Sequence, residues 1–421
     1  MNPDQNAERL RSVFARDCNA VAWPTARPFD PDRALRLIHR LAFPRAVGTP
    51  GERLAARLVE RALTRSGRPV VRERFPVGTT ARRVGSLLAF LGASVLVTIG
   101  VILAASWPFL SALCALGAGY LVNAPWIVTR SLADRFRARV WSDNLVTWPT
   151  TADDAEAAPA RVVFLAHYDS KSQRLPTGLR VALVVSVTVG CVILVGLTLA
   201  KMVLGHVVGF WPFAVLGTVM NGCLIALMCN ASGNRSPGAL DNGSGLAVLL
   251  ELARVWDARD DAPVEVVFLA TGAEEVGLDG ARAFLLRHEW WLRERPTLLI
   301  NLESLGAGSR VWLAGSPGAV SLAEAVAESQ SIPTARFRIL GAGMDHEPFA
   351  AAGLDTVSLL GDVVGTSAVL HTPHDGIHLI DRDSLIRSAR LATHLALSWA
   401  DRLRRSGDSP ALAVVRSDEE G

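Results

Sequence analysis

The chain has few cysteines and no concentrated positive charge. Five cysteines occur among 421 residues, none of them in a CxxC pair, so neither a disulfide framework nor a cysteine-ligated zinc site is indicated. The net charge is only +3, and no basic run is interleaved with aromatic residues, so we expect no nucleic-acid partner. The N-terminal stretch MNPDQNAERLRSVFARD is polar and is not typical of a signal peptide.

Charge is also absent from two long stretches, which predicts membrane segments. Residues 84–129 form an uncharged run of about 46 residues, roughly enough for two spans of about 20 residues with a turn at SWPF. Residues 181–200 and 207–229 form a second uncharged pair, joined by KMVLGH. We therefore expect a protein that is integral to the lipid bilayer, with two transmembrane hairpins, at 84–129 and 181–230, and four spans.

Positive charge borders only one side of these hairpins. The flanking basic residues are Arg82, Arg83, Arg130, Arg135, Arg137, Arg139, Lys171, Arg174, Arg180 and Arg235. The turns between paired spans hold only Lys201 and His206. The positive-inside rule places the basic side in the cytoplasm. Residues 1–83, 130–180 and 231–404 would then share that compartment and fold as one domain, followed by a disordered tail at 405–421.

Outside the hairpins, the sequence predicts both strands and helices, and the later strands alternate with helices. Strands are predicted at 69–77, 143–148, 161–166, 264–270, 297–302, 310–315, 335–340 and 355–360. Helical spacing occurs at 32–66, with a break at 44–51, and at 246–256, 281–294, 321–330 and 384–403. This alternation predicts an α/β fold, a three-layer sandwich around a mixed, mainly parallel sheet.

Histidine and acidic side chains follow the ends of several predicted strands. His167 and Asp169 come directly after RVVFLA, and Glu303 directly after TLLINL. Glu274 and Glu275 stand side by side shortly after VEVVFLA. Functional residues collect at the carboxyl ends of strands in folds of this class. Adjacent buried carboxylates are costly unless a positive charge holds them, so the pair indicates a cation.

Two further residues complete a possible metal site. Asp241 precedes a glycine-rich helix start in ALDNGSG, and His371 lies in HTPHD with Asp375 nearby. Taken singly, each has a plain structural explanation, such as an N-cap aspartate. Together the residues supply imidazole and carboxylate without thiolate, which suits zinc, with manganese or cobalt as alternatives. Five ligands with one shared carboxylate are enough for two metals about 3.5–4 Å apart.

These motifs resemble the family of two-zinc exopeptidases that includes bacterial leucine aminopeptidases, glutamate carboxypeptidase and, by divergence, glutaminyl cyclases. The matching motifs are HYD (167–169), ALDNGSG (239–245), GAEEVGLDGA (272–281), NLESLG (301–306), MDHEPF (344–349) and HTPHD (371–375), with FPRAVGTPGE (43–52) fitting the opening helix region. The resemblance covers the soluble segments from about Pro31 to Arg404. It implies a zinc-dependent aminopeptidase acting on peptides, membrane-anchored here by the hairpins.

The resemblance also implies a ligand set for two zinc ions. Asp241 would bridge both ions. His167 and Glu303 would complete one site, and Glu275 and His371 the other. Glu303 stands where many members of the family have aspartate, a longer side chain that should still reach a metal.

Other family positions carry the reaction in this comparison. Glu274 would be the general base that takes a proton from the metal-activated water, and Asp169 would orient the histidine ligand of the same motif. Asp345 and His346 match a motif near the substrate whose roles the resemblance does not assign. Met344 stands where serine is common.

Two other functions are compatible with parts of the pattern. HYDSK (167–171) and ELAR (251–254) also resemble glutaminyl cyclases, which would make the protein an acyltransferase with one zinc. A catalytically inactive membrane scaffold is the second alternative, and loss of a ligand would mark it, whereas all five ligands and Glu274 are present. The number of bound metals separates peptidase from cyclase, and catalysis separates both from a scaffold.

The position of the hairpins suggests where the site faces. If the strands at 69–77, 143–148 and 161–166 are neighbours in sequence order, both hairpins leave from the sheet edge that carries His167. The active site would then face the membrane surface, and its substrates could be membrane-associated peptides. Oligomeric state is not predicted.

Overall fold

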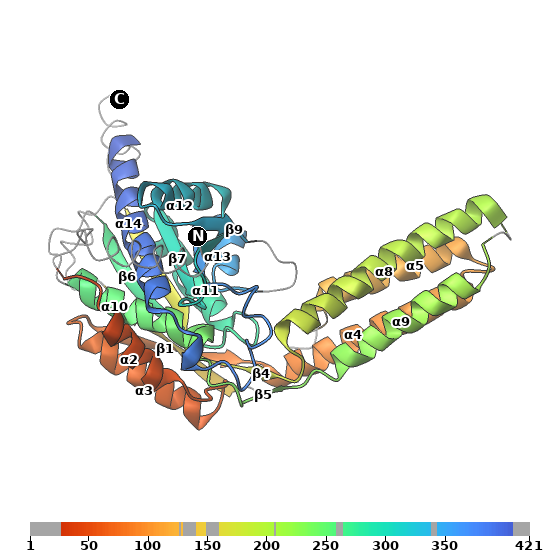
Figure 1. The fold of residues 1–421 in the computed structure, drawn as a ribbon, viewed down its shortest axis with the longest axis horizontal. Helices are drawn as coiled ribbons and strands as arrows, with labels where there is room; N and C mark the ends of the chain where they lie inside the picture. The colour runs from red at the N-terminus through yellow and green to blue at the C-terminus, as the bar shows by residue number, and fades with distance from the viewer. Residues whose placement is uncertain are drawn as a thin grey trace, which may run out of the picture.

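The computed structural model describes residues 27–125, 128, 140–148, 160–205, 208–257, 264–337 and 343–406. An α/β domain carries a rod of four helices that projects from one side (Figure 1). This confirms the predicted sandwich with helical insertions. The tail beyond residue 406, the second half of the strand predicted at 335–340, His206 and the arginines at 130–139 lie outside the described residues.

The domain is organised around an eight-stranded mixed sheet in the order β1-β2-β6-β3-β7-β10-β8-β9. The strands are β1 (Val70–Val77), β2 (Val140–Thr147), β3 (Arg161–His167), β6 (Glu265–Thr271), β7 (Thr297–Glu303), β8 (Val311–Gly315), β9 (Thr334–Arg336) and β10 (Asp355–Leu360). The central strands β6, β3, β7 and β10 are parallel, whereas β1, β2 and β8 pair antiparallel with their neighbours, apart from the parallel β8–β9 pair.

The predicted strand order is wrong at one place. β6 lies between β2 and β3, so the first three strands are not neighbours in sequence order. The physical reason is burial: β3 and β6 are buried along their whole length, which suits parallel pairing in the middle of a sheet covered on both faces. Because β2 runs antiparallel to β6, its start still lies at the carboxyl edge of β3 and β6. The first hairpin therefore does leave from the edge that carries His167, as predicted.

Alternate residues of each strand serve two separate hydrophobic cores. In β3, Val162 and Phe164 pack in the larger core, whereas Val163 and Leu165 pack in the smaller one. The helices on the larger side are α2 (Pro31–Leu41), α3 (Pro50–Thr64), α10 (Gly245–Asp257), α12 (Pro317–Ser329) and α14 (Arg382–Ser406). The smaller side is covered by α11 (Asp279–Arg293) and α13 (Glu347–Ala351). These layers leave the carboxyl edge of the sheet free for loops.

The helix α3 begins at a cap that also buries a carboxyl group. Thr49 caps the helix by accepting the backbone N–H of Glu52, and the Glu52 side chain accepts the backbone N–H of Gly48 at 2.5 Å. The other oxygen of Glu52 accepts the Ser142 hydroxyl, also at 2.5 Å. Burial raises the pKa of Glu52 to about 7.

This raised pKa predicts that stability falls as pH rises. The folded state holds the Glu52 proton more tightly than an unfolded chain, so this favourable contribution is complete below about pH 4.5 and is lost as pH passes about 7. The loss could reach about 3 kcal/mol, at about 1.4 kcal/mol for each pKa unit. We expect the melting temperature in detergent to fall between pH 5 and 8, and Glu52→Gln to flatten that slope. An equal slope in the variant would show that other groups control it.

The two insertions form paired antiparallel helices. α4 (Thr79–Leu103), α8 (Thr177–Leu204) and α9 (Trp211–Met228) are long and apolar enough to cross a membrane, whereas α5 (Pro108–Asn123) has 16 residues, about 24 Å at 1.5 Å per residue. The turn predicted at SWPF is confirmed. KMVL, predicted as a connection, is instead the last turn of α8.

The four helices pack through small residues and expose apolar ones. A Cβ added at Gly217 of α9 would lie 2.5 Å from the Val101 side chain of α4, and one at Gly190 of α8 would lie 2.8 Å from Met220 of α9. Small residues of this kind allow close helix packing in lipid. Large aliphatic side chains such as Ile102, Val192 and Val203 are exposed on the outside of the rod. Three of the four helices are long and apolar enough to cross a membrane, and water would hydrate such a surface unfavourably.

Candidate metal centre

His167, Asp241 and Glu303 form the first cluster of possible ligands. His167 ends β3 and Glu303 ends β7, so both lie at the carboxyl edge of the sheet. His167 Nε2 is 3.3 Å from an oxygen of Asp241 and 3.3 Å from an oxygen of Glu303. All three residues are buried, and their ligand atoms lie within 4.8 Å of one another. The structure thus gathers residues that are 62 or more positions apart in the chain.

Asp241, Glu275 and His371 form the second cluster. His371 Nε2 lies 2.9 Å from Asp241 Oδ2 and 3.1 Å from Glu275 Oε2. Asp241 uses Oδ1 toward the first cluster and Oδ2 toward the second, so one carboxylate faces both. This is the arrangement expected of a bridging ligand between two cations.

The donor set fits a pair of dications. Buried in this centre, Glu275 Oε1 has no hydrogen-bond partner among the residues that the structure describes. A buried carboxylate oxygen without a partner is costly unless a cation binds it. Imidazole and carboxylate are the ligands that zinc takes in sites without cysteine. The residues present therefore fit zinc ions in both clusters.

The loop between β6 and α11 presents Glu274 to the same centre. Glu274 Oε2 lies 4.0 Å from His167 Nε2, on the side of the first cluster. Burial and the neighbouring carboxylates of Glu275 and Glu303 raise the pKa of Glu274 well above its usual range.

Asp169 holds this loop as well as its own histidine. Its carboxylate accepts the backbone N–H of Glu274 at 3.1 Å and that of Glu275 at 3.2 Å. The same carboxylate is 3.5 Å from His167 Nδ1, whose closer partner is the Asp169 backbone oxygen at 3.2 Å. The predicted contact between the Asp169 carboxylate and the His167 ring is therefore present, but at 3.5 Å it is long for a hydrogen bond. The hydrogen bonds to the glutamate loop were not predicted, because loop conformation decides them.

Two buried charged residues support the ligands from behind. The Arg45 guanidinium donates to the backbone oxygens of Tyr168, Pro237 and Gly238 at 2.6–2.8 Å, joining the end of β3 to the loop before Asp241. Asp375 accepts the backbone N–H groups of Leu240 and Asp241 at 2.7 and 3.2 Å. Burial raises the pKa of Asp375 to about 7. The only sequence signal for Arg45 was its place inside the motif FPRAVGTPGE.

Lys171 is a third residue that sequence reasoning did not place. Its amine is 2.7 Å from Glu275 Oε2 and donates to the Glu275 backbone oxygen at 3.0 Å. It supplies one positive charge to a cluster dominated by carboxylates. HYDSK therefore contributes more than its histidine and aspartate to this site.

Asp345 and His346 lie beside the centre but outside both clusters. Asp345 accepts the hydroxyl of Thr271, and burial raises its pKa to about 7. Its other oxygen is buried and has no hydrogen-bond partner in the described part of the chain, which omits residues 338–342. His346 Nδ1 lies 2.7 Å from the Ser358 hydroxyl, and burial lowers the pKa of His346 to about 4.

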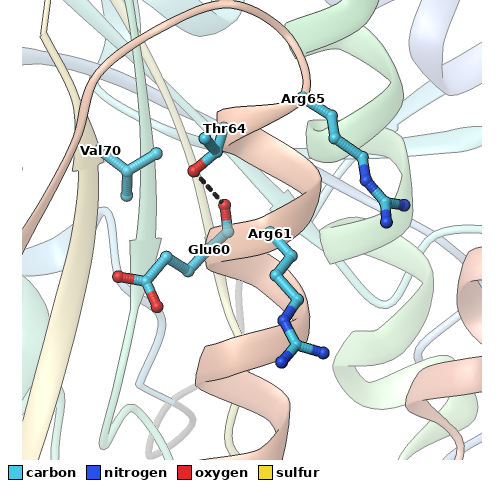
Figure 2. Close-up of a pocket in the computed structure, with 5 residues that line it drawn as sticks. All are labelled: Glu60, Arg61, Thr64, Arg65 and Val70. Carbon is cyan, nitrogen blue, oxygen red and sulfur yellow. Dashed lines mark hydrogen bonds between the residues drawn. The ribbon is translucent and has the colours of Figure 1, made fainter.

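A surface pocket elsewhere on the domain has no part in this centre. It lies between the end of α3 and the start of β1 and is lined by Glu60, Arg61, Thr64, Arg65 and Val70 (Figure 2). The Thr64 hydroxyl donates to the Glu60 backbone oxygen there, an ordinary helical contact. None of the predicted site residues lines it.

The fold and the arrangement of acids and histidines define a class of protein, the zinc exopeptidase fold. A zinc aminopeptidase from Bacillus subtilis, BSAP, superposes with a TM-score of 0.53 at 17% identity, covering 87% of this chain and 95% of that one. A glutaminyl cyclase from Fimbriiglobus ruber gives a TM-score of 0.51 at 16% identity, covering 88% and 96%. The two likenesses show the same fold and do not separate the two chemistries.

Sequence comparison then gives the family. Residues 146–396, more than half of the chain, match the model of Peptidase family M28, and the chain belongs to that family. Aminopeptidase YwaD of Bacillus subtilis (strain 168) is 32% identical over 171 residues, which are 38% of this chain and 37% of YwaD. A vacuolar membrane protease of Schizosaccharomyces japonicus is 43% identical over 76 residues, 18% of this chain and 8% of that protein. The matches thus span less than two fifths of either relative.

Proposed function

We propose that this protein is a membrane-anchored metallo-aminopeptidase that removes N-terminal residues from peptides with two zinc ions. The observation that carries the proposal is the position of Asp241, which faces His167 on one side and His371 on the other. A carboxylate shared by two ligand clusters can bridge the two metal ions of a two-metal hydrolase. Membership of the peptidase family supports the same reaction.

The ligands divide between the two ions by the clusters they form. His167, Asp241 and Glu303 would hold one zinc, and Asp241, Glu275 and His371 the other. When bound, zinc supplies Lewis acidity, which lowers the pKa of water and polarises a carbonyl group. The first cluster has one histidine and two carboxylates, as does the second, so the two sites are chemically similar.

Glu274 would carry the proton in this reaction. It lies 4.0 Å from His167 Nε2 at the edge of the first cluster, where a carboxylate could take a proton from water and return it to the leaving amine. Asp169 fixes its main chain through the two loop hydrogen bonds. The proton carrier is therefore placed by the same residue that contacts His167.

The surrounding acids favour a substrate with a free α-amino group. Within the described ranges Asp345 has a buried oxygen without a hydrogen-bond partner, and Glu274 lies in the same carboxylate-rich centre. A protonated amine would interact favourably with these carboxylates, whereas a neutral amide in the middle of a chain would not. This supports exopeptidase action at the N-terminus.

Two alternatives predict different behaviour from the same fold. A glutaminyl-cyclase-like acyltransferase would need one zinc, yet both clusters here have complete ligand sets. An inactive scaffold would need no proton carrier, yet Glu274 is in place. We favour the peptidase on these two observations.

The test is hydrolysis of a panel of aminoacyl amides and short peptides by detergent-purified protein with added zinc. We expect release of N-terminal residues and about two zinc ions per chain. Cyclisation of N-terminal glutamine with one zinc per chain would instead establish the cyclase. Two bound zinc ions without turnover of any substrate would favour the scaffold.

We also propose that the rod of helices crosses the membrane as four spans, with the domain on the cytoplasmic side. The exposed aliphatic surface of the rod and the basic residues at its base, such as Arg82 and Lys171, support this orientation. His167 and Glu303 of the centre end β3 and β7, at the sheet edge from which the first hairpin leaves, so membrane-associated peptides are suitable substrates.

The orientation can be tested with a reporter fused after Arg404. We expect a cytoplasmic reporter such as green fluorescent protein to be active and a reporter that requires export, such as alkaline phosphatase, to be inactive. Fusions in the 104–107 turn should give the opposite pattern. Activity of the exported reporter after Arg404 would reverse the proposed sidedness.

A further inference from the structure

The second ring nitrogen of His371 is held by the base of the second membrane hairpin. Nε2 faces Asp241 and Glu275, as described above. Nδ1 faces away from the centre, 3.0 Å from Thr177 Oγ1 and 3.2 Å from Gln173 Nε2. Thr177 is the first residue of α8, a helix long enough to span the membrane.

Both ends of this hairpin join the same network. Gln173 lies in β4 (Ser172–Gln173), which pairs with β5 (Ser232–Gly233) just after α9. The Asn230 side chain, at the end of the hairpin, donates to Gln173 Oε1 at 3.1 Å. The backbone N–H of Gln173 donates to the backbone oxygen of His371 at 2.8 Å.

The backbone conformation of His371 is a second reason why surrounding contacts are needed to hold this residue in place. Its φ is +61°, a left-handed conformation that a histidine adopts at a cost. Conformations of this kind persist where surrounding contacts over-determine them. The contacts here come from the segment that leads into α8.

The hydrogen-bond directions single out one acceptor for Nδ1. The backbone N–H of Leu175 donates to Asn230 Oδ1 at 3.0 Å, so the Asn230 amide nitrogen must face Gln173. Gln173 therefore presents its oxygen to Asn230 and its amide nitrogen, a donor, to His371. A histidine that binds metal through Nε2 carries its proton on Nδ1 and needs an acceptor there. Of the two neighbouring side chains, the Thr177 hydroxyl alone can accept.

We propose that Thr177 is a positioning residue for the zinc ligand His371, so that the base of the membrane hairpin forms part of the outer shell of the metal centre. The inference rests on the proposed role of His371 as a ligand. An outer-shell partner fixes the ring orientation and the tautomer, and its loss typically lowers metal affinity by about 10–100-fold. The membrane anchor would thereby contribute directly to zinc binding.

The experiment measures zinc retention against a competing chelator in full-length, detergent-purified protein. We compare wild type, Thr177→Val and Thr177→Ser, with Thr198→Val as the matched control. Thr198 is a buried threonine of the same helix whose hydroxyl donates to the backbone oxygen of Val195. Melting temperature is recorded for each variant.

We expect Thr177→Val to release one of two zinc ions at a chelator concentration about 10–100-fold lower than wild type does. Thr177→Ser, which keeps the hydroxyl, and Thr198→Val should retain both ions like wild type.

A second variant supplies a hydrogen-bond acceptor for Nδ1 from another position. Gln173→Glu in the Thr177→Val background places a carboxylate oxygen beside Nδ1 and should restore most of the affinity.

The outcomes separate this inference from the proposed function. If wild type binds two zinc ions and Thr177→Val holds both within about twofold of wild type, Thr177 does not position His371. Equal loss of zinc in Thr198→Val would show a general effect of the hairpin and also overturn the inference. Wild type with fewer than two zinc ions would contradict the two-ion function itself.

Discussion

Glu274→Gln should reduce peptide hydrolysis by about 10²–10⁴-fold while leaving both zinc ions bound. Glutamine has nearly the size of glutamate and can still form hydrogen bonds, but it cannot accept a proton. Glu274 belongs to neither ligand cluster, although it lies 4.0 Å from His167. The measurement is kcat on an aminoacyl amide together with zinc content per chain.

A neighbouring substitution provides the control for this result. Glu275→Gln makes the same chemical change at the adjacent residue. Glu275, however, belongs to the second cluster, where its Oε2 lies 3.1 Å from His371 Nε2. It should therefore lose zinc as well as activity. If Glu274→Gln also lost zinc, Glu274 would be a ligand and not the proton carrier proposed here. If only Glu274→Gln lost zinc, the roles of the two glutamates would have to be exchanged.

Asp241→Asn should lower the affinity for both zinc ions by more than the roughly 100-fold typical of an outer-shell change. Asp241 is the one residue that the two clusters share, and asparagine offers a neutral oxygen on one side only. Hydrolysis should become undetectable. Zinc content after dialysis against a weak chelator is the direct measurement, and we expect it to approach zero.

Single-cluster variants make this prediction specific. Glu303→Gln removes a ligand from the first cluster and His371→Ala from the second, so each should retain about one zinc ion. Retention of one ion by Asp241→Asn would show that Asp241 serves a single site. Circular dichroism and melting temperature should be recorded for all three proteins, because the two histidines lose a compensating charge when Asp241 is changed.

Most of the architecture could be predicted from local sequence. Strand β10 was predicted at its observed bounds, and the other strands of the sheet up to β8 within about three residues, because short runs rich in apolar and β-branched residues between turn residues favour strands. The uncharged runs located the hairpins because length and charge are properties of the sequence alone. The helix starts at 79 and 177 lie before the predicted boundaries, since the helices continue through polar residues at their base.

The strand order could not be predicted in the same way. Whether β3 pairs with β2 or β6 depends on which partner completes a sheet that is buried on both faces. We assumed that strands adjacent in sequence pair with one another. In the folded domain, β6 lies between β2 and β3 because both of its faces are buried there. Nor could the contacts of Arg45 be predicted, because they reach Tyr168 and Gly238 across more than 100 residues.

The sequence by itself determined that histidine and carboxylate side chains stand at the ends of two strands and outside the strands at three other motifs, and hence the candidate ligand set of the centre. His167, Asp241, Glu275, Glu303 and His371 could be named from motif and position. Only the tertiary structure decided that Asp241 faces both clusters, that Asp169 holds the glutamate loop, and that Thr177 contacts His371. The physical reason is that hydrogen bonds and shared ligands depend on distances between atoms, which the folded chain sets between residues far apart in sequence.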